Sequence, residues 1–454
     1  MKNIASKLPS EQYEKNFSDL HPPLTHNSAI AESNRCLYCY DSPCMKACPT
    51  HIDISTFIKK ISTGNFFGSA KTIYKSNWVP LTCAKACPVH VLCEGACVYN
   101  EKGEKPIEIG KLQRFVIEKY FSQGMPPLFN KAPKNGKSVG IVGSGPAGLA
   151  CGSELSLLGY EAVIYEANKI PGGLNTWGIA PYKMRREDSL KEVDLVKSYG
   201  VEIKTEVMIG KIVTMDDLLK KHDAVFLGVG LGESPQLAIL GEELSGVVGA
   251  LDFIEKVKKE NWEEVQVGKK VAVIGAGNTS IDAATESKRL GAEQVYIIYR
   301  RSDIEMSAYD FEYDLAKKDG IIFYFLTSPK RIIGKEFVEG IECLKMKLGE
   351  PDIHGRRKPV PIPGSEFTIP VDMVIKAIGQ ETKSSFLSSI PKVTLDDEGC
   401  VIVDHDTFQT ANPKIFAGGD CINGGKEVVN AAHDGKHAAH GIDKYLSIQK
   451  GGKQ

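Results

Sequence analysis

The cysteines are the residues of this chain whose type and spacing most clearly indicate chemistry. The sequence has 12 of them, and eight lie between Cys36 and Cys97. They are arranged as Cys36-x2-Cys39-x4-Cys44-x3-Cys48-Pro49, then Cys83-x3-Cys87-Pro88 and Cys93-x3-Cys97. Thiolates bind Fe–S clusters, and close runs that end in Cys-Pro are typical of ferredoxins. The block therefore predicts Fe–S clusters, and its thiols suffice by count for two [4Fe–4S] clusters.

Zinc is the alternative occupant of such a block. Structural zinc prefers well-separated pairs of C-x2-C, and this block has only the one that starts at Cys36. Fe–S clusters are therefore favoured, with a zinc-stabilised, non-catalytic adaptor as the alternative of another functional class. In two-cluster ferredoxins the last cysteine of a run serves the other cluster, so Cys48 is expected to cross over. The remaining cysteines, Cys151, Cys343, Cys400 and Cys421, are expected to be packing thiols.

A nucleotide-binding pattern follows the cysteine block. The segment KSVGIVGSGPAGLACGSELSLLGYEAVIYEA predicts a strand, a glycine turn, a helix and a second strand. Gly143 permits the tight turn, Gly145 lets the backbone approach a pyrophosphate, and Gly148 lets the helix pack on the strand. The pyrophosphate is expected at the helix N-terminus, where free N–H groups favour anions. Glu166 ends the second strand, where an acid would bind the ribose hydroxyls.

The pattern recurs in KKVAVIGAGNTSIDAATESKRLGAEQVYIIYRR, which predicts a second dinucleotide site. Gly275 and Gly277 occupy the first two glycine positions. The second strand ends near Arg300 and Arg301 instead of an acid. Arginines at this point suit the 2′-phosphate of NADP, which favours NADPH over NADH. The alternative is that they are solvated residues at the end of a strand.

Two further segments resemble motifs of reductases that have two dinucleotide domains. The segment Pro171-Gly172-Gly173-Leu174 resembles the stretch beside their flavin ring, and Gly418-Gly419-Asp420 resembles the turn whose Asp binds the flavin's ribityl chain. This resemblance implies that the first unit and the C-terminal segment bind FAD. The second unit would then be an insertion that binds the nicotinamide nucleotide.

A wider resemblance is carried by RCLYCYDSPCMKACPTHIDISTFI, LTCAKACPVHVLCEGAC and IEIGKLQRFV, followed by the two nucleotide units. These segments resemble the electron-input part of dihydropyrimidine dehydrogenases, above all the separate flavin subunit of the bacterial enzyme. The resemblance implies electron flow from NAD(P)H through FAD and two [4Fe–4S] clusters to a partner subunit. That partner would contain FMN and Fe–S clusters and reduce uracil or thymine. Glutamate synthase small subunits and the large subunit of bifurcating ferredoxin:NADP reductases are similar and are the alternatives.

The resemblance also implies individual ligands, and it implies no catalytic side chain because the cofactors carry out the chemistry. One cluster would be held by Cys36, Cys39, Cys44 and Cys97. The other would be held by Cys48, Cys87, Cys93 and Gln113, with Cys83 not a ligand. The FAD contacts would be Gly143, Ser144, Gly145, Pro146, Ala147, Gly148, Glu166, Gly172, Gly173, Leu174, Lys183, Gly419 and Asp420. The nicotinamide nucleotide contacts would be Gly275, Gly277, Asn278, Thr279, Arg300, Arg301 and Gly379.

The chain departs from the family pattern at two places. Lys183 stands where the family has Arg, which keeps the charge but loses a bidentate fork. NADP-using members also carry another basic residue near the position of Ser307, and this chain has none between Arg301 and Lys317. NADH therefore stays open as the alternative co-substrate.

These patterns together predict an α/β protein with an α-helical N-terminal domain. The expected domains are 1–130 for the Fe–S clusters, 131–232 for the first part of the FAD domain, 233–380 for the NAD(P)H domain, and 381–454 for the second part of the FAD domain. The segment Pro126–Lys137 is expected to be a linker.

Composition excludes some functions. The formal net charge of −1 offers no basic field for nucleic acid or an anionic membrane surface. No apolar run approaches the length of a membrane span, and the N-terminus lacks the apolar core of a secretory signal. A cytoplasmic location is expected.

Overall fold

The computed structural model describes residues 1–454 except 2, 260, 352–356 and 452–454. The chain divides into two compact units. Unit 1 comprises Met1–Asp19, Ala180–Tyr182 and Gly232–Glu381, and unit 2 comprises Leu20–Ile179, Lys183–Leu231 and Thr382–Gln454. The first nineteen residues, expected within the cluster domain, thus group with the segment expected to bind the nicotinamide nucleotide. None of the described helices combines the length and the hydropathy that crossing a membrane requires.

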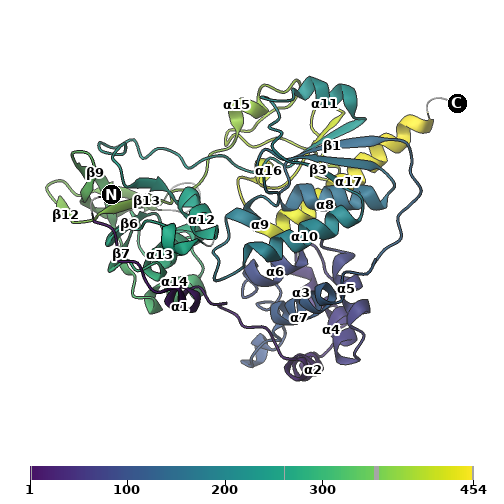
Figure 1. The fold of residues 1–454 in the computed structure, drawn as a ribbon, viewed down its shortest axis with the longest axis horizontal. Helices are drawn as coiled ribbons and strands as arrows, with labels where there is room; N and C mark the ends of the chain where they lie inside the picture. The colour runs from purple at the N-terminus through teal and green to yellow at the C-terminus, as the bar shows by residue number, and fades with distance from the viewer. Residues whose placement is uncertain (2, 260, 352–356, 452–454) are drawn as a thin grey trace. The chain divides into compact units, whose positions relative to one another are not determined.

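The cysteine-rich part of unit 2 is helical, as the sequence predicts (Figure 1). Its helices are α2 (His26–Arg35), α3 (Pro43–Lys46), α4 (Ile54–Ser62), α5 (Phe66–Tyr74), α6 (Pro80–Ala86) and α7 (Ile109–Ser122). Helix α4 buries Ile54, Phe57, Ile58 and Ile61, which is the spacing of one helix face. Asp53 caps this helix by accepting from the Thr56 amide at 3.1 Å.

The rest of unit 2 is built on a parallel sheet in the order β14-β4-β1-β2-β3. The strands are β1 (Ser138–Val142), β2 (Glu161–Tyr165), β3 (Glu202–Lys204), β4 (Ala224–Leu227) and β14 (Ile415–Ala417). The helices are α8 (Pro146–Leu157), α9 (Leu174–Trp177), α10 (Arg186–Ser198), α11 (Met215–Lys221), α15 (Ser384–Leu387), α16 (Asp420–Asn423) and α17 (Val428–Gly451). Helices α8 and α17 lie side by side against this sheet (Figure 1). The sheet is therefore completed by a strand from near the C-terminus.

Unit 1 contains a second parallel sheet in the order β5-β13-β6-β7-β8, and an antiparallel sheet. The parallel strands are β5 (Val247–Gly249), β6 (Lys270–Ile274), β7 (Gln294–Ile298), β8 (Ile322–Tyr324) and β13 (Met373–Lys376). The antiparallel strands are β9 (Thr327–Gly334), β10 (Val338–Pro351), β11 (Arg357–Pro361) and β12 (Phe367–Ile369). The helices are α1 (Ser10–Asn16), α12 (Ala250–Lys258), α13 (Asn278–Arg289) and α14 (Asp310–Lys318).

The N-terminal arm is anchored within unit 1 by an aromatic stack. The ring of Phe17, which is fully buried, stacks on Trp262 with centroids 4.6 Å apart. Tyr13 on α1 lies against the same indole ring, and Asn16 donates to the carbonyl of Arg289 at 2.7 Å. These contacts explain why the arm belongs to this unit although the cysteine block follows it in sequence.

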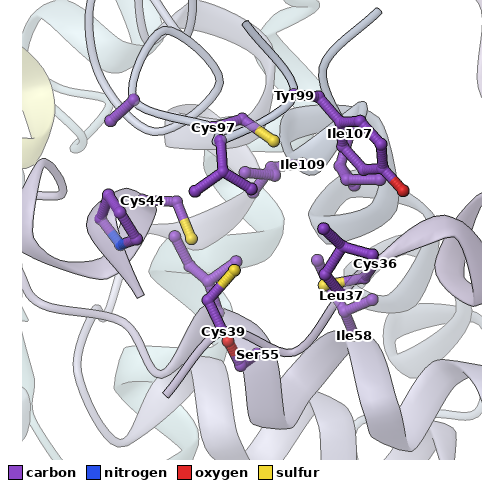
Figure 2. A pocket seen from close by; sticks show the side chains of 14 residues that line it. Cys36, Leu37, Cys39, Cys44, Ser55, Ile58, Cys97, Tyr99, Ile107 and Ile109 are labelled. Atoms are coloured by element: carbon purple, nitrogen blue, oxygen red, sulfur yellow. The ribbon is translucent and has the colours of Figure 1, made fainter. Parts of the chain in front are cut away.

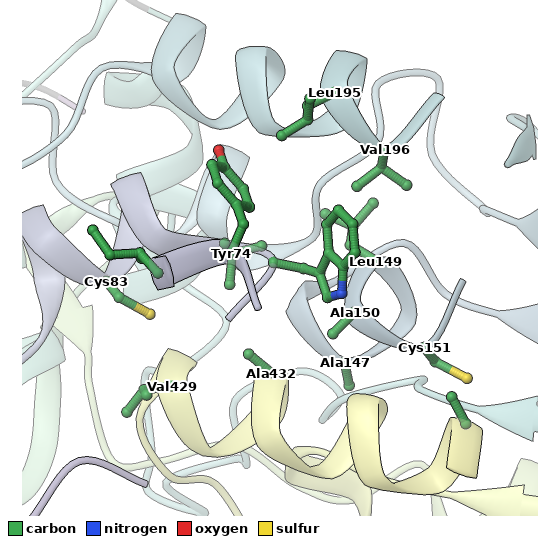
Figure 3. Close-up of a cluster of buried hydrophobic side chains, with 14 of the residues drawn as sticks. Tyr74, Cys83, Ala147, Leu149, Ala150, Cys151, Leu195, Val196, Val429 and Ala432 are labelled. Atoms are coloured by element: carbon green, nitrogen blue, oxygen red, sulfur yellow. The ribbon is translucent and has the colours of Figure 1, made fainter. Parts of the chain in front are cut away.

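Within unit 2 the cluster-bearing helices and the nucleotide fold share one hydrophobic core. Figure 3 shows Tyr74 of α5 beside Leu195 of α10 and Ala432 of α17. Trp78 is 1% exposed, and its indole nitrogen donates to Glu154 on α8 at 3.1 Å. The segment predicted as a linker also packs here, because Leu128 is 2% exposed and its amide donates to the Tyr199 hydroxyl. The two parts of unit 2 are thus joined by packing as well as by the chain.

A buried carboxyl group fixes this junction. Glu192 on α10 is 1% exposed, and its carboxyl group accepts from the amides of Leu81 at 2.6 Å and Thr82 at 3.2 Å, and from the Thr82 hydroxyl. These amides are the free N–H groups at the start of α6. Burial raises the pKa of Glu192 to about 8, and the hydrogen bonds from Thr82 and Leu81 oppose the shift. One turn before it, Asp188 forms an ion pair with Lys85 of α6 at 2.6 Å.

We predict that Glu192→Ala destabilises unit 2, because two amides and a hydroxyl lose their acceptor where water does not reach. The expected loss is about 2–4 kcal/mol in the free energy of unfolding, measured by urea denaturation followed by tryptophan fluorescence. Asp194→Ala is the matched control, since Asp194 lies on the same helix with a side chain that is 63% exposed. This control should change the free energy by less than about 0.5 kcal/mol. Equal stability of the two variants would contradict the role given to Glu192.

Candidate functional site

Four of the predicted cluster ligands surround one hollow. The thiols of Cys36, Cys39, Cys44 and Cys97 line it, and Figure 2 shows their sulfur atoms facing the space between them. Two left-handed residues, Tyr38 (φ 52°) and Ser42 (φ 24°), curl the chain around this hollow. The Ser42 hydroxyl donates to the Cys39 carbonyl at 2.6 Å, which fixes the turn. The fold therefore brings together cysteines that lie up to 61 positions apart in the sequence.

The walls of the hollow are apolar. Ile54 and Ile58 of α4 lie on one side, and Ile107 and Ile109 lie on another. Burial and the neighbouring thiols of Cys36, Cys97 and Cys39 raise the pKa of Cys44 to about 12. Thiols this close to one another do not all ionise without a positive charge between them. Iron supplies such a charge, so the donor set fits an Fe–S cluster.

The same geometry bears on zinc. Within the described part of the chain, no group of three or more His, Cys, Asp or Glu side chains is arranged to hold a metal ion. A zinc ion needs four ligands at about 2.0–2.3 Å from one centre. The thiols around the hollow therefore do not form a closed zinc site in this structure.

A second group of thiols lies nearby. A hydrogen bond with Cys83, burial, and the neighbouring thiols of Cys93 and Cys48 raise the pKa of Cys87. Gln113 on α7 is 6% exposed, and its amide nitrogen donates to the Pro80 carbonyl at the start of α6 at 2.7 Å. Helices α6 and α7 pack against each other, so the amide is held beside the helix that carries Cys83 and Cys87. The structure thus places the thiols of Cys48, Cys93 and Cys83 close to that of Cys87.

The first glycine turn has the close approaches that the fingerprint requires. Gly143 has a φ of 96°, and a Cβ there would lie 2.4 Å from the Gly228 carbonyl oxygen. A Cβ on Gly148 would lie 2.0 Å from the Gly143 carbonyl oxygen. A Cβ on Gly145 would meet nothing within 4 Å, so the start of α8 is open where a pyrophosphate would bind. Pro146 and Ala147 form the first turn of this helix.

Glu166 and Ser144 connect the first glycine turn to the predicted flavin loop, Pro171–Leu174. The Glu166 carboxylate accepts from the Ser144 amide at 3.0 Å and from its hydroxyl at 2.6 Å. The amide of Gly172 in turn donates to the Ser144 hydroxyl at 2.9 Å. Gly173 (φ 58°) approaches Gly145 so closely that a Cβ would lie 2.7 Å from its Cα. The turn and the flavin loop are therefore one rigid assembly.

The other FAD contacts predicted from the sequence lie in the same unit. Gly419 has a φ of 77°, and its amide donates to Asp434 of α17 at 3.1 Å. Asp420 begins α16, and burial raises its pKa. Leu174 begins α9 and is 41% exposed, and Lys183 lies between α9 and α10.

Asn175 is a residue that the sequence analysis missed. It follows Leu174 of the flavin loop, lies on helix α9 and is only 1% exposed. Neither its amide nitrogen nor its amide oxygen has a hydrogen-bond partner among the described residues. A buried amide costs free energy unless it is paired, so this side chain needs a polar partner that the chain does not supply. A bound flavin would provide one. Its only sequence signal is its place directly after Leu174 of the predicted flavin segment.

The second glycine turn shows a matching architecture in unit 1. Gly275 has a φ of 122°, and a Cβ there would lie 2.1 Å from the Ala377 carbonyl oxygen. Gly277 precedes α13, which begins at Asn278. The side-chain amide oxygen (Oδ1) of Asn278 accepts from the Tyr309 amide at 3.1 Å, and Thr279 is exposed. Gly379 (φ 102°) follows the neighbouring strand β13 and has open space around its Cα.

The arginines at the end of β7 have an additional basic neighbour that the sequence analysis missed. Arg300 is exposed, and the guanidinium of Arg301 donates to the carbonyl of Arg357 at 3.1 Å. Hydrogen bonds from Ser302 and the charge of Arg357 lower the pKa of Glu305 in the same loop. Arg357 of the antiparallel strand β11 therefore lies beside this loop, in which no basic residue occurs between Arg301 and Lys317.

Comparison with known proteins agrees with this geometry. Residues 13–125 match the family described as dihydropyrimidine dehydrogenase domain II, 4Fe–4S cluster, and residues 137–435 match the pyridine nucleotide-disulphide oxidoreductase family. The glutamate synthase [NADPH] small chain of Escherichia coli is 35% identical, and the match covers 97% of this chain and 96% of that one. The beta subunit of the NADP(+)-dependent formate dehydrogenase of Moorella thermoacetica is 36% identical, with 89% of this chain and 60% of that one covered.

Among solved structures, FprA of Mycobacterium tuberculosis in complex with NADPH is similar, with a TM-score of 0.58 and 22% identity. The match covers 71% of this chain and 86% of FprA, and it concerns the fold.

These findings confirm the coarser predictions. A flavin and Fe–S oxidoreductase that uses a pyridine nucleotide is confirmed, with FAD, [4Fe–4S] iron–sulfur and NADPH as its cofactor set. A specific relationship to dihydropyrimidine dehydrogenase is not confirmed, because the relatives that match nearly end to end are glutamate synthase small chains. The chain belongs to the pyridine nucleotide-disulphide oxidoreductase family and carries a [4Fe–4S] domain ahead of its nucleotide-binding region.

Proposed function

We propose that this chain is the electron-input subunit of a larger oxidoreductase, which accepts hydride from NADPH and passes single electrons to a partner chain. The observation that carries this proposal is the presence, in one compact unit, of a four-thiol hollow and a complete dinucleotide turn. Bound FAD and Fe–S clusters supply the exchange between two-electron and one-electron chemistry. The side chains bind and orient these groups and exclude water.

The ligand assignment is part of the proposal. One cluster is held by Cys36, Cys39, Cys44 and Cys97, and the second by Cys48, Cys87, Cys93 and Gln113. FAD binds to the first glycine turn, the flavin loop and the Gly419–Asp420 turn, with Asn175 as a further contact. The nicotinamide nucleotide binds to the second glycine turn, within a domain inserted in the FAD domain. The bounds 1–130, 131–232, 233–380 and 381–454 describe these regions.

Two partners are supported by different observations. An FMN-containing subunit that reduces uracil or thymine is supported by the match of residues 13–125 to a dihydropyrimidine dehydrogenase domain. A glutamate synthase large subunit is supported by the nearly complete match to glutamate synthase small chains. Reconstitution with each partner distinguishes them, since NADPH oxidation then depends on uracil in one case and on glutamine and 2-oxoglutarate in the other.

Electron transfer from NADPH through the flavin to the clusters gives a direct prediction. Anaerobic titration of the purified chain with NADPH should bleach the flavin bands and the broad Fe–S absorption together, because both groups lie in one unit. The chain without its partner should not reduce uracil. A colourless protein, or a flavin that is reduced without any Fe–S band, would contradict the proposal and favour the zinc-stabilised adaptor, since zinc thiolates do not absorb above roughly 400 nm.

Arg357 gives a prediction on the preference for NADPH over NADH. Arg357→Ala should weaken NADPH binding by about tenfold to a hundredfold, the value of one charged hydrogen bond (about 1.5–3 kcal/mol), and should leave NADH binding unchanged. The rate of flavin reduction at varied concentrations of each nucleotide measures both affinities.

Lys358→Ala is the matched control. Lys358 is also exposed, but adjacent side chains of a strand point to opposite faces, so it should not contact the same phosphate. An equal loss of affinity for NADPH and NADH, or no loss in Arg357→Ala, would show that Arg357 takes no part in recognising the 2′-phosphate.

A further inference from the structure

Lys383 lies directly before α15 and holds the loop that follows β4. Its ammonium group donates to the Val229 carbonyl at 2.7 Å and to the Leu231 carbonyl at 2.6 Å. All three residues belong to unit 2. Because β4 ends at Leu227, the two hydrogen bonds fix the ammonium nitrogen beyond the carboxyl end of this strand.

The strand order of the sheet reverses at this point. From β1 the chain continues to β2 and β3 on one side, whereas β4 lies on the other side of β1. In open parallel sheets, ligands bind in the crevice outside the carboxyl ends of the two strands at such a reversal. The first glycine turn follows β1, and the loop held by Lys383 follows β4. Both therefore border the crevice in which a dinucleotide is expected.

The loop after β4 also packs closely against the glycine turn. A Cβ on Gly143 would lie 2.4 Å from the Gly228 carbonyl oxygen and 3.5 Å from the Cα of Val229. The Val229 carbonyl that accepts from Lys383 is thus one residue away from the turn. A Cβ on Gly230 would meet nothing within 4 Å, as at Gly145 on the turn itself, so both segments leave space for a ligand.

The charge of Lys383 is not neutralised by the chain. Of the residues that the structure describes, no carboxylate lies within ion-pair distance of its ammonium nitrogen. The two carbonyls use two of its three hydrogens and leave one free. The surrounding protein lowers the pKa of Lys383 although its side chain is exposed to solvent, and Cys421 and Glu166 oppose this shift. A lysine in such a recess is stabilised by a bound anion.

We propose that Lys383 binds the pyrophosphate of FAD, and that the loop Val229–Leu231 holds its ammonium group in place for this contact. The pyrophosphate is the part of FAD that is charged at neutral pH, so it is the group that such a cation recognises. Lys383 thereby adds a charged side chain to the backbone amides at the start of α8. The proposal rests on the proposed function, since it requires FAD at the first glycine turn.

The test measures the dissociation constant of FAD in full-length variants. Each holoprotein is diluted in steps, and the free FAD is separated by ultrafiltration and measured by its fluorescence. Lys383→Met should raise the dissociation constant by about tenfold to a hundredfold, the value of a charged hydrogen bond. Lys383→Gln can still donate to a backbone carbonyl but has no charge, so it should show most of the same loss. Lys383→Arg keeps the charge and should recover most of the affinity.

Lys414→Met is the matched control. Lys414 also donates to a backbone carbonyl, that of Leu219 at 3.2 Å, but it directly precedes β14 at the amino end of the sheet. This variant should bind FAD like the wild type, and an equal loss in Lys414→Met and Lys383→Met would overturn the proposal.

Two further results would also overturn it. Wild-type affinity in both Lys383→Met and Lys383→Gln would show that Lys383 does not contact FAD. Wild-type affinity in Lys383→Gln alone would show that Lys383 only holds the loop and that its charge has no role. A wild-type protein that binds no FAD would instead contradict the proposed function.

Discussion

Helix α6 begins in the interior of unit 2, where its first amide groups need an acceptor and water cannot provide one. Glu192 provides it from α10, a helix of the nucleotide fold. The same helix carries Ser189, whose hydroxyl is hydrogen-bonded to that of Thr176 on α9, directly after the flavin loop, at 2.8 Å. One helix therefore holds the segment of Cys83 and Cys87 on one side and the flavin loop on the other. The separation between the two proposed redox sites is set by α10.

The two nucleotide units have the same fold and differ in the residue that ends their second strand. Both have a glycine of positive φ at the end of the first strand, where any side chain would collide with a backbone carbonyl. They differ at the end of the second strand. In unit 2 Glu166 is held by Ser144 and the loop around it, whereas in unit 1 Arg300 is exposed. A fixed acid suits a ribose diol, and an exposed cation suits a phosphate.

Much of this arrangement could be predicted from sequence because the signals are local. The glycine turns, Glu166 and the helices over Ile54–Ser62 and Ile109–Ser122 each depend on a few neighbouring residues. The grouping of Cys36, Cys39 and Cys44 also follows from their spacing. Other features depend on contacts between distant segments. Arg357 reaches Arg301 through a strand pairing, and the N-terminal arm joins unit 1 through Trp262. No local pattern encodes either contact.

The two proposed clusters differ in the charge of their ligands. An amide ligand such as Gln113 carries no charge, so a cluster with three thiolates has one negative charge fewer than a cluster with four. The Thr50 hydroxyl lies 3.4 Å from the Cys48 sulfur, where a donated hydrogen bond stabilises an added electron further. On the proposed assignment, an added electron is therefore more stable on the second cluster, whose ligand Cys87 ends helix α6 beside the nucleotide fold. Onward transfer then depends on the potential of the acceptor, which suits an input subunit that should release electrons only to its partner.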